Sequence, residues 1–142
     1  MSGDFEIGGQ PAGIRDALDR WLQAFGRAWQ AGDADAIAAL FHADGVFFET
    51  PFGPPVKGVA AIRDHWAAML AEQGNVVFMY RVMAAETDLG IARWAAQFDL
   101  RPAGKRIEYD GILEYRHHPD GSARILRMWW HNREAPQRRP NA

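Results

Sequence analysis

The chain contains no cysteine, which excludes a disulfide framework, a thiolate metal site and a thiol nucleophile. Serine is almost as scarce. Ser2 lies near the N-terminus and Ser122 in a predicted turn, so a Ser-His-Asp hydrolase is excluded too. A chain without cysteine suits a reducing compartment, and we therefore expect a cytoplasmic protein.

An excess of positive charge is also missing. Lys and Arg total 16 against 18 Asp and Glu, a net charge of −2, so we expect neither nucleic acid nor an anionic membrane as a partner. The longest apolar runs, such as 36–41 and 66–71, fall far short of the ~20 residues that cross a bilayer. Residues 1–13 lack the basic and apolar segments of a signal peptide. These absences predict a soluble protein that is not exported by that route.

Aromatic residues, in contrast, are abundant. The 142 residues, 48% hydrophobic and 24% charged, predict one globular domain over 1–142. Six Trp and eight Phe provide more bulky aromatic surface than a small core usually requires. Aromatic side chains line ligand pockets as well as cores, so a pocket and a plain aromatic core are both open at this point.

Three helices are predicted in the first half of the chain. Gly32 ends the first in a left-handed conformation, and Asp33 caps a short second helix that reaches Phe41. A third helix begins after Gly58 and ends near Gly74. The first helix is recognised by apolar residues that recur every three or four positions. These residues are Ile14, Leu18, Trp21, Phe25 and Trp29.

Five strands are predicted from β-rich segments, the last four with a period of two. Turn residues connect those last four, which favours an antiparallel meander. The helices would cover one face of this curved, mixed or antiparallel sheet, giving an α+β fold with a cone-shaped interior. We expect 1–12 and 134–142 to be flexible ends. The predicted strands are 46–50, 76–83, 91–100, 106–117 and 123–132.

Three motifs resemble the nuclear transport factor 2-like superfamily. They are GD-x-DAI at 32–37, PFG-x-P at 51–55 and G-x-x-x-I at 58–62. The chain is most similar to the SnoaL-like and ketosteroid isomerase-like branch, over about residues 18–132. This resemblance implies a single domain with the cystatin-like α+β cone, and a homodimer formed through the outer face of the sheet.

The resemblance does not extend to the chemistry of ketosteroid isomerases, which need a carboxylate base and two proton donors. The base position falls on Thr50, whose hydroxyl does not ionise near neutral pH. The position of the donating Tyr falls on Phe25. The third position falls on Gly111, next to Asp110. We therefore do not expect steroid isomerisation, but we keep the pocket.

The direction of Asp110 is left open by the sequence. Strict alternation along 107–115 turns Asp110 away from the cone. A β-bulge at Gly111 would reverse the alternation and turn the carboxyl group inward. Asp110 is therefore either a solvated or interface residue or an acid inside the pocket.

Alternation in the last strand places Met128, Trp130 and Asn132 on one face, which the resemblance assigns to the cavity. Trp129 and His131 then occupy the convex face. Two adjacent tryptophans cannot both point inward, so burial of Trp129 requires an outer interface. This is the strongest indication of a homodimer in the sequence.

The histidines indicate no metal site. His117 and His118 are adjacent in a turn, and no pair has the spacing that a metal requires. His65, beside Trp66, is expected to be a surface or boundary residue. His131 is an acid or base candidate only if the alternation of its strand is reversed. Because no Gly-rich phosphate loop follows a strand either, we predict neither a metal nor a cofactor.

These observations predict a largely apolar cavity for a small apolar or aromatic molecule. One hypothesis is a cyclase, isomerase or hydratase in which Asp110 is the general acid/base. The alternative is a non-catalytic ligand-binding or dimerisation module. An epoxide hydrolase of the limonene type lacks the Asp-Arg-Asp set that it needs. The expected polar groups, besides Asp110, are Thr50 and Asn132. The expected walls are Trp21, Phe25, Trp29, Trp66, Met69, Trp94, Phe98, Met128 and Trp130.

Overall fold

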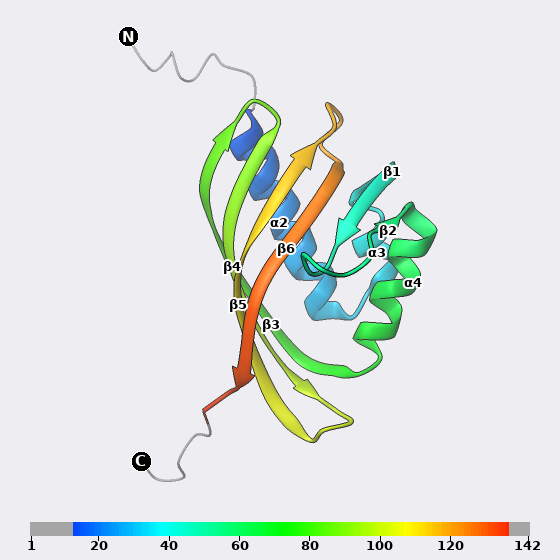
Figure 1. The fold of residues 1–142 in the computed structure, drawn as a ribbon, viewed down its shortest axis with the longest axis vertical. Coiled ribbons are helices and arrows are strands. Elements are labelled where there is room, and N and C mark those ends of the chain that lie inside the picture. The colour runs from blue at the N-terminus through cyan, green and yellow to red at the C-terminus, as the bar shows by residue number, and fades with distance from the viewer. Residues whose placement is uncertain (1–12, 137–142) are drawn as a thin grey trace.

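The computed structural model describes residues 13–136, which form three helices and six strands (Figure 1). The helices are α2 (Ile14–Ala31), α3 (Ala34–Ala38) and α4 (Val59–Leu70). The strands are β1 (Phe41–Phe48), β2 (Val56–Lys57), β3 (Gln73–Glu86), β4 (Leu89–Leu100), β5 (Lys105–His117) and β6 (Ala123–Glu134).

The strands form one curved sheet in the order β2-β1-β6-β5-β4-β3. Strands β3 to β6 are an antiparallel meander, whereas β1 pairs in parallel with β6. Helix α2 runs along the concave face, and α3 and α4 lie toward the β1 and β2 edge (Figure 1). The predicted α+β fold with a mixed sheet is confirmed.

The helix ends follow the capping residues. Gly32 has φ 68° and closes α2, and the Asp33 carboxylate accepts a hydrogen bond from the Ala36 N–H (3.0 Å) at the start of α3. The second helix, however, stops at Ala38. Phe41 was expected in that helix and instead begins β1, because it is paired with Ala123 of β6.

Other element boundaries also differ from the prediction, among them the end of β1 at Phe48. Helix α4 ends at Leu70, and the chain is already extended at Gln73. Strand β2 was missed because two residues are too few to show a period. Glu134, expected in a flexible end, is the last residue of β6 and pairs with Ile107. The predicted flexible segment 1–12 and the rest of the C-terminal one, from 137 on, lie outside the described residues.

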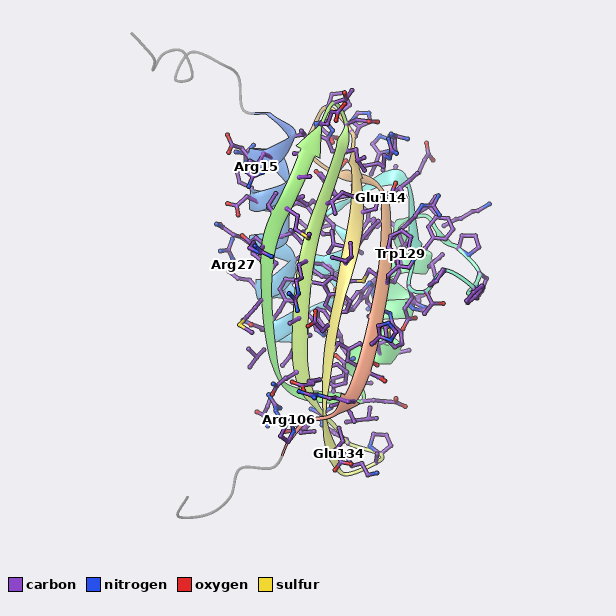
Figure 2. The ribbon with its side chains drawn as sticks, turned by 60° about the vertical axis from the view of Figure 1, so that its left-hand side comes forward. Arg15, Arg27, Arg106, Glu114, Trp129 and Glu134 are labelled. Carbon is purple, nitrogen blue, oxygen red and sulfur yellow. The ribbon has the colours of Figure 1, made fainter. Side chains whose placement is uncertain are left out.

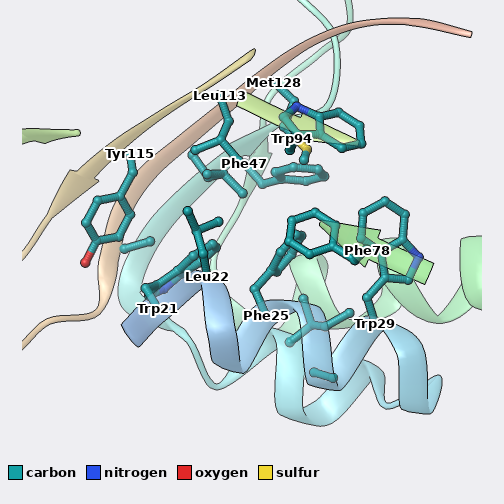
Figure 3. Packing of buried hydrophobic residues seen from close by; sticks show 14 of the residues in the cluster. Trp21, Leu22, Phe25, Trp29, Phe47, Phe78, Trp94, Leu113, Tyr115 and Met128 are labelled. Atoms are coloured by element: carbon teal, nitrogen blue, oxygen red, sulfur yellow. The ribbon is translucent and has the colours of Figure 1, made fainter. Parts of the chain in front are cut away.

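The core lies between α2 and the sheet, where three aromatic residues of α2 pack against aromatic and aliphatic side chains of the strands and of α4 (Figure 3). Trp21 stacks on Phe25 at 5.1 Å between ring centroids and donates its indole N–H to the Leu40 carbonyl (2.7 Å). Phe25 in turn meets Trp29 and Trp66 edge-on. Such pairs add to the stabilisation from burial alone, so this network fixes the helix on the sheet.

Two tyrosines predict a loss of stability at alkaline pH. Burial and the hydrogen bond to the Asp19 carboxylate (2.7 Å) raise the pKa of Tyr80 to about 12, and burial raises the pKa of Tyr115. In the unfolded chain both hydroxyls ionise near pH ~10. The stabilisation that these two protonated hydroxyls contribute to the folded state is therefore complete below about pH 10. It is lost as the pH rises through their pKa values in the folded protein.

Urea denaturation between about pH 8 and pH 11 checks this expectation. The free energy of unfolding should fall over the upper part of that range. The Tyr80→Phe variant should show a shallower fall, since of these two hydroxyls it keeps only that of Tyr115. A free energy of unfolding that is independent of pH above about 10 would contradict the prediction.

Candidate functional site

A cavity of about 50 Å³ lies between α2, α4 and the concave face of the sheet. A cavity needs roughly 10–15 Å³ of such volume to hold one water molecule, so this cavity has room for a few water molecules. The pockets of larger metabolites measure about 300–1,000 Å³, so a ligand here must be small or the walls must move. Its lining residues are Trp29, Phe47, Glu49, Trp66, Met69, Gln73, Trp94, Phe98, Tyr109, Met128 and Trp130.

Most of the predicted apolar walls meet at this cavity. The seven that line it are Trp29, Trp66, Met69, Trp94, Phe98, Met128 and Trp130. Trp21 and Phe25 do not line it. Both are buried nearer the N-terminus of α2 than Trp29, and Trp21 packs there against Phe41 and Tyr115. The structure places these two residues in the core.

Two predicted polar groups also lie elsewhere. The Thr50 hydroxyl accepts a hydrogen bond from the Gly53 N–H (3.0 Å) in the loop after β1, and it does not line the cavity. Asn132 is exposed near the end of β6, at a surface hollow that also includes Asp110 and His131. Neither group lines the space that was predicted for it.

Asp110 lies on the convex face, outside the pocket. Gly111 is paired with Trp94 and Trp130 in an unbroken register, so β5 has no bulge there and the inward alternative is wrong. The Asp110 carboxylate instead accepts two hydrogen bonds from the Arg93 guanidinium, at 3.1 and 2.7 Å. Arg93 lowers the pKa of Asp110, whose side chain is 55% exposed. Asp110 is therefore an ionised surface residue and not a pocket acid.

The same register places His131 on the convex face, opposite Asp110. The acid or base role considered for His131 required the reverse alternation, so it is also wrong for this pocket.

An ionisable pair that the sequence did not reveal lies at the cavity. The Glu49 Oε1 and His65 Nε2 atoms are 2.7 Å apart, and Glu49 lines the cavity. The two side chains are 38% and 31% exposed, which places them at the mouth of the pocket. Glu49 follows the end of β1, and its carbonyl accepts the indole N–H of Trp130 (2.9 Å). His65 lies on α4 with its ring against Phe47.

The signal for this pair was faint. Glu49 directly precedes Thr50, so the alignment on PFG missed the carboxyl group by one residue. His65 is 16 residues away on a helix, and no local spacing links it to Glu49. Only the packing of α4 against β1 brings the two side chains together.

Two of the tryptophan walls carry buried donors without a partner. The indole N–H groups of Trp66 and Trp94 make no hydrogen bond within residues 13–136, although both side chains are nearly fully buried. A third wall, Trp29, is satisfied by the Gln73 side chain at 2.7 Å. The site thus combines an acid/base pair at its mouth with mainly aromatic walls.

Neither a metal centre nor a membrane span is found in the part of the chain that the structure describes. Over residues 13–136, no three His, Asp or Glu side chains gather as a metal would require. None of the helices in that range combines the length and hydrophobicity needed to cross a bilayer.

The model of the SnoaL-like domain matches residues 21–128 of the chain. The protein belongs to the SnoaL-like domain family. Its fold also matches solved structures, which are 19–20% identical in the three cases given next. No curated protein sequence matches the chain.

The first solved structure is SalBIII, described as an epoxide hydrolase/cyclase-like enzyme of pyran ring formation in salinomycin. It is 20% identical in sequence, the match covers 82% of this chain and 94% of that chain, and the TM-score is 0.70. The Δ5-3-ketosteroid isomerase from Mycobacterium sp. is 19% identical, with 81% of this chain and 93% of that chain covered and a TM-score of 0.69. A Mycobacterium tuberculosis protein in complex with estradiol-17beta-hemisuccinate is 19% identical, with 81% of this chain and 94% of that chain covered and a TM-score of 0.70. At these identities the likeness shows the fold alone.

Proposed function

We propose that this SnoaL-like protein binds a small apolar or aromatic metabolite and moves a proton on it through Glu49 and His65. The observation that carries this proposal is the 2.7 Å carboxylate-imidazole contact at the mouth of a pocket with mainly apolar walls. Acid/base pairs in such pockets are the usual signature of proton-transfer sites. Glu49 and His65 take over the role that the sequence assigned to Asp110.

The geometry gives each group a distinct task. Glu49 lines the cavity, so its carboxylate is the group that meets the bound molecule. His65 contacts Oε1 from the side of α4, so it positions the Glu49 carboxyl group. A carboxylate can take a proton from a carbon or a hydroxyl group and return it at another position of the same molecule. Isomerisation, cyclisation and hydration all need such a transfer.

The fold relatives support this class of reaction without selecting one member of it. One is named as an isomerase and another as an epoxide hydrolase/cyclase-like enzyme. Steroid isomerisation remains disfavoured for this chain. The hydroxyl of Thr50 is used in its own turn, and Phe25, at the position of the donating Tyr, has no hydroxyl and is buried in the core.

A non-catalytic ligand-binding module is the second candidate. The observation that favours it is the dense contact of the aromatic walls. The Trp29 ring centroid lies within 6.5 Å of the ring centroids of three other walls, Trp66, Trp94 and Phe98. In this case the pocket would bind a ligand, and Glu49 would serve only to orient it.

The probe 5-nitrobenzisoxazole separates the two candidates. This flat aromatic molecule gives up its ring C–H proton to a base, its N–O bond breaks, and a coloured phenolate nitrile forms. We expect tryptophan fluorescence to report binding and the native protein to open the ring faster than acetate buffer does. Binding without acceleration would favour the non-catalytic module, whereas neither binding nor acceleration would contradict both.

We also propose that the protein is a homodimer through the convex face of the sheet, with a second copy as the partner. Trp129 is 40% exposed on this face (Figure 2). Val77, Met79 and Met83 of β3 point to the same side and are exposed as well. The Trp129 and β3 side chains lie on either side of the Arg93–Asp110 ion pair of β4 and β5, and a two-fold partner that covered this face would bury both groups.

Trp129→Lys should weaken the dimer by at least about 30-fold, because a charge replaces a central aromatic anchor on both copies at once. Sedimentation over a dilution series measures the dissociation constant. Phe52→Lys is the matched control, since Phe52 is fully exposed in the loop between β1 and β2. A mass of 15.9 kDa for the native protein at micromolar concentration would contradict the proposal.

A further inference from the structure

The cavity is smaller than the aromatic ligands that its apolar walls could bind. Its volume is about 50 Å³, whereas an apolar cavity of about 150 Å³ takes up benzene. A single aromatic ring therefore needs more room than the walls leave open, and at least one lining residue must move to admit it. The lining residues differ in their freedom to do so.

Seven of the eleven lining residues are aromatic, and their rings hold one another in place. Each ring has a neighbour in the set at 6.5 Å or less between centroids, and these contacts join all seven into one network. The indole N–H of Trp130 also donates to the Glu49 carbonyl (2.9 Å). In an interior packed this closely, one ring cannot turn without displacing others. The seven are Trp29, Phe47, Trp66, Trp94, Phe98, Tyr109 and Trp130.

Three of the four other lining residues are held as well. The Glu49 carboxylate contacts the His65 ring at 2.7 Å. The Gln73 side-chain oxygen accepts the indole N–H of Trp29, also at 2.7 Å. Met128 is 3% exposed in β6, a strand with β1 on one side and β5 on the other. Moving any of these three side chains would break a polar contact or disturb the packing of the sheet.

The fourth residue, Met69, is only partly buried and lies on α4. It follows His65 by four residues, so the two share one face of the helix and Met69 lies beside the acid/base pair at the mouth. A methionine side chain is unbranched, turns about three bonds and makes favourable contacts with aromatic rings through its sulfur. Met69 is therefore the wall that can swing aside and then close on a ring that has entered.

We propose that Met69 is the specificity-determining residue of this pocket, and that the ligand carries a flat ring with one unsubstituted edge. The inference rests on the proposed function, since it requires the pocket to bind a small apolar molecule. The unsubstituted edge enters between the aromatic walls once Met69 has moved. Substituents or a second fused ring lie at the mouth beside Glu49. A ring with substituents on every side would press one of them against walls that cannot move.

Toluene and 1,3,5-trimethylbenzene test this selection. Toluene has an unsubstituted edge, whereas every edge of the trimethyl compound carries a methyl group. Burial alone would favour the larger compound by about fourfold for each added methyl group. We expect the native protein to bind toluene about tenfold more tightly instead, because overpacking costs more than the added burial gives. A preference of the native protein for the trimethyl compound would overturn the inference.

The affinities can be measured by NMR on protein labelled with 13C at its methionine methyl groups. The Met128 methyl group lines the cavity and reports binding in every Met69 variant. Met79 and Met83 are exposed on β3, so their signals should stay in place. In the native protein, the Met69 methyl group should also show Overhauser contacts to bound toluene. Binding of toluene without these contacts would contradict the closure of Met69 on the ring.

Variants at Met69 assign the selection to this residue. Met69→Ala should bring the affinities for the two compounds within about twofold of each other or reverse the preference, because it removes the side chain that limits the space. Met69→Leu keeps the bulk and should keep the native ratio. Met79→Ala makes the same change as Met69→Ala at an exposed position and should also keep it.

The outcomes separate this inference from the proposed function. A Met69→Ala variant that binds toluene with the native ratio of affinities would overturn the role of Met69 and leave ligand binding intact. If neither compound moves the Met69 or Met128 signal of the native protein, the pocket does not bind small apolar molecules, and the proposed function fails together with this inference.

Discussion

Gly111→Ala is expected to destabilise the protein by about 3–5 kcal/mol, a large part of the stability of a domain this size. A Cβ atom added at Gly111 would lie 1.9 Å from the Trp129 carbonyl oxygen and 2.9 Å from the Trp130 Cα. Both are backbone atoms of the neighbouring strand, so no change of side-chain rotamer relieves the contact. The strands β5 and β6 would have to separate where they form the base of the pocket.

Two other glycines provide controls for this substitution. A Cβ added at Gly90 would meet the end of the Leu18 side chain at 2.6 Å, which can move, so Gly90→Ala should cost less, about 1–3 kcal/mol. Gly13 has open space, and Gly13→Ala should have little effect. Chemical denaturation of the three variants gives the order. A Gly111→Ala variant as stable as Gly13→Ala would contradict the close approach of the strands.

Gly111 also shows what a glycine in a strand can and cannot predict. The sequence allowed a bulge at this position, which would have turned Asp110 into the pocket. A close approach of two backbones is the other reason for such a glycine, and it leaves the alternation unchanged. The sequence around Gly111 cannot distinguish a bulge from a close approach, because the backbone atoms that approach Gly111 belong to β6, which follows in the chain after a turn.

The fold itself was largely predictable, because local rules and the final architecture agree. The spacing of apolar residues along α2 identified its buried face, and Gly32 and Asp33 marked the boundary with α3. The alternation of β3 to β6 and the turn residues between them predicted the meander. Phe41 was wrongly predicted to be helical, because it is in a strand only through its pairing with Ala123, a residue far along the chain.

The candidate site was predicted less well, for two physical reasons. Helical spacing shows which face of α2 is buried but not which part of that face borders a cavity, so Trp21 and Phe25 looked the same as Trp29. Only Trp29 reaches the cavity. The acid/base pair depends on the packing of α4 beside the end of β1, and no motif of the sequence records that packing. Periodicity in the sequence predicts the helices and strands, whereas a site between two layers depends on how those layers pack.

Glu49→Gln is expected to slow the ring opening of 5-nitrobenzisoxazole by about 10²–10⁴-fold, the range for loss of a positioned general base. The amide keeps the size of the carboxyl group and can still contact His65, but it cannot accept the proton of the bound molecule. Binding of the probe, followed by tryptophan fluorescence, should change little. The effect should therefore appear in kcat and not in KM.

Asp110→Asn is the matched control, because it makes the same chemical change on the convex face, where Asp110 is held by Arg93. Its rate should stay within about twofold of the native rate, since surface substitutions away from the site change little. His65→Gln should cost less than Glu49→Gln, because His65 positions the carboxylate and does not line the cavity. If Asp110→Asn slowed the reaction as much as Glu49→Gln, general acid/base chemistry at the mouth of this pocket would be the wrong assignment, because the two carboxyl groups lie on opposite faces of the sheet.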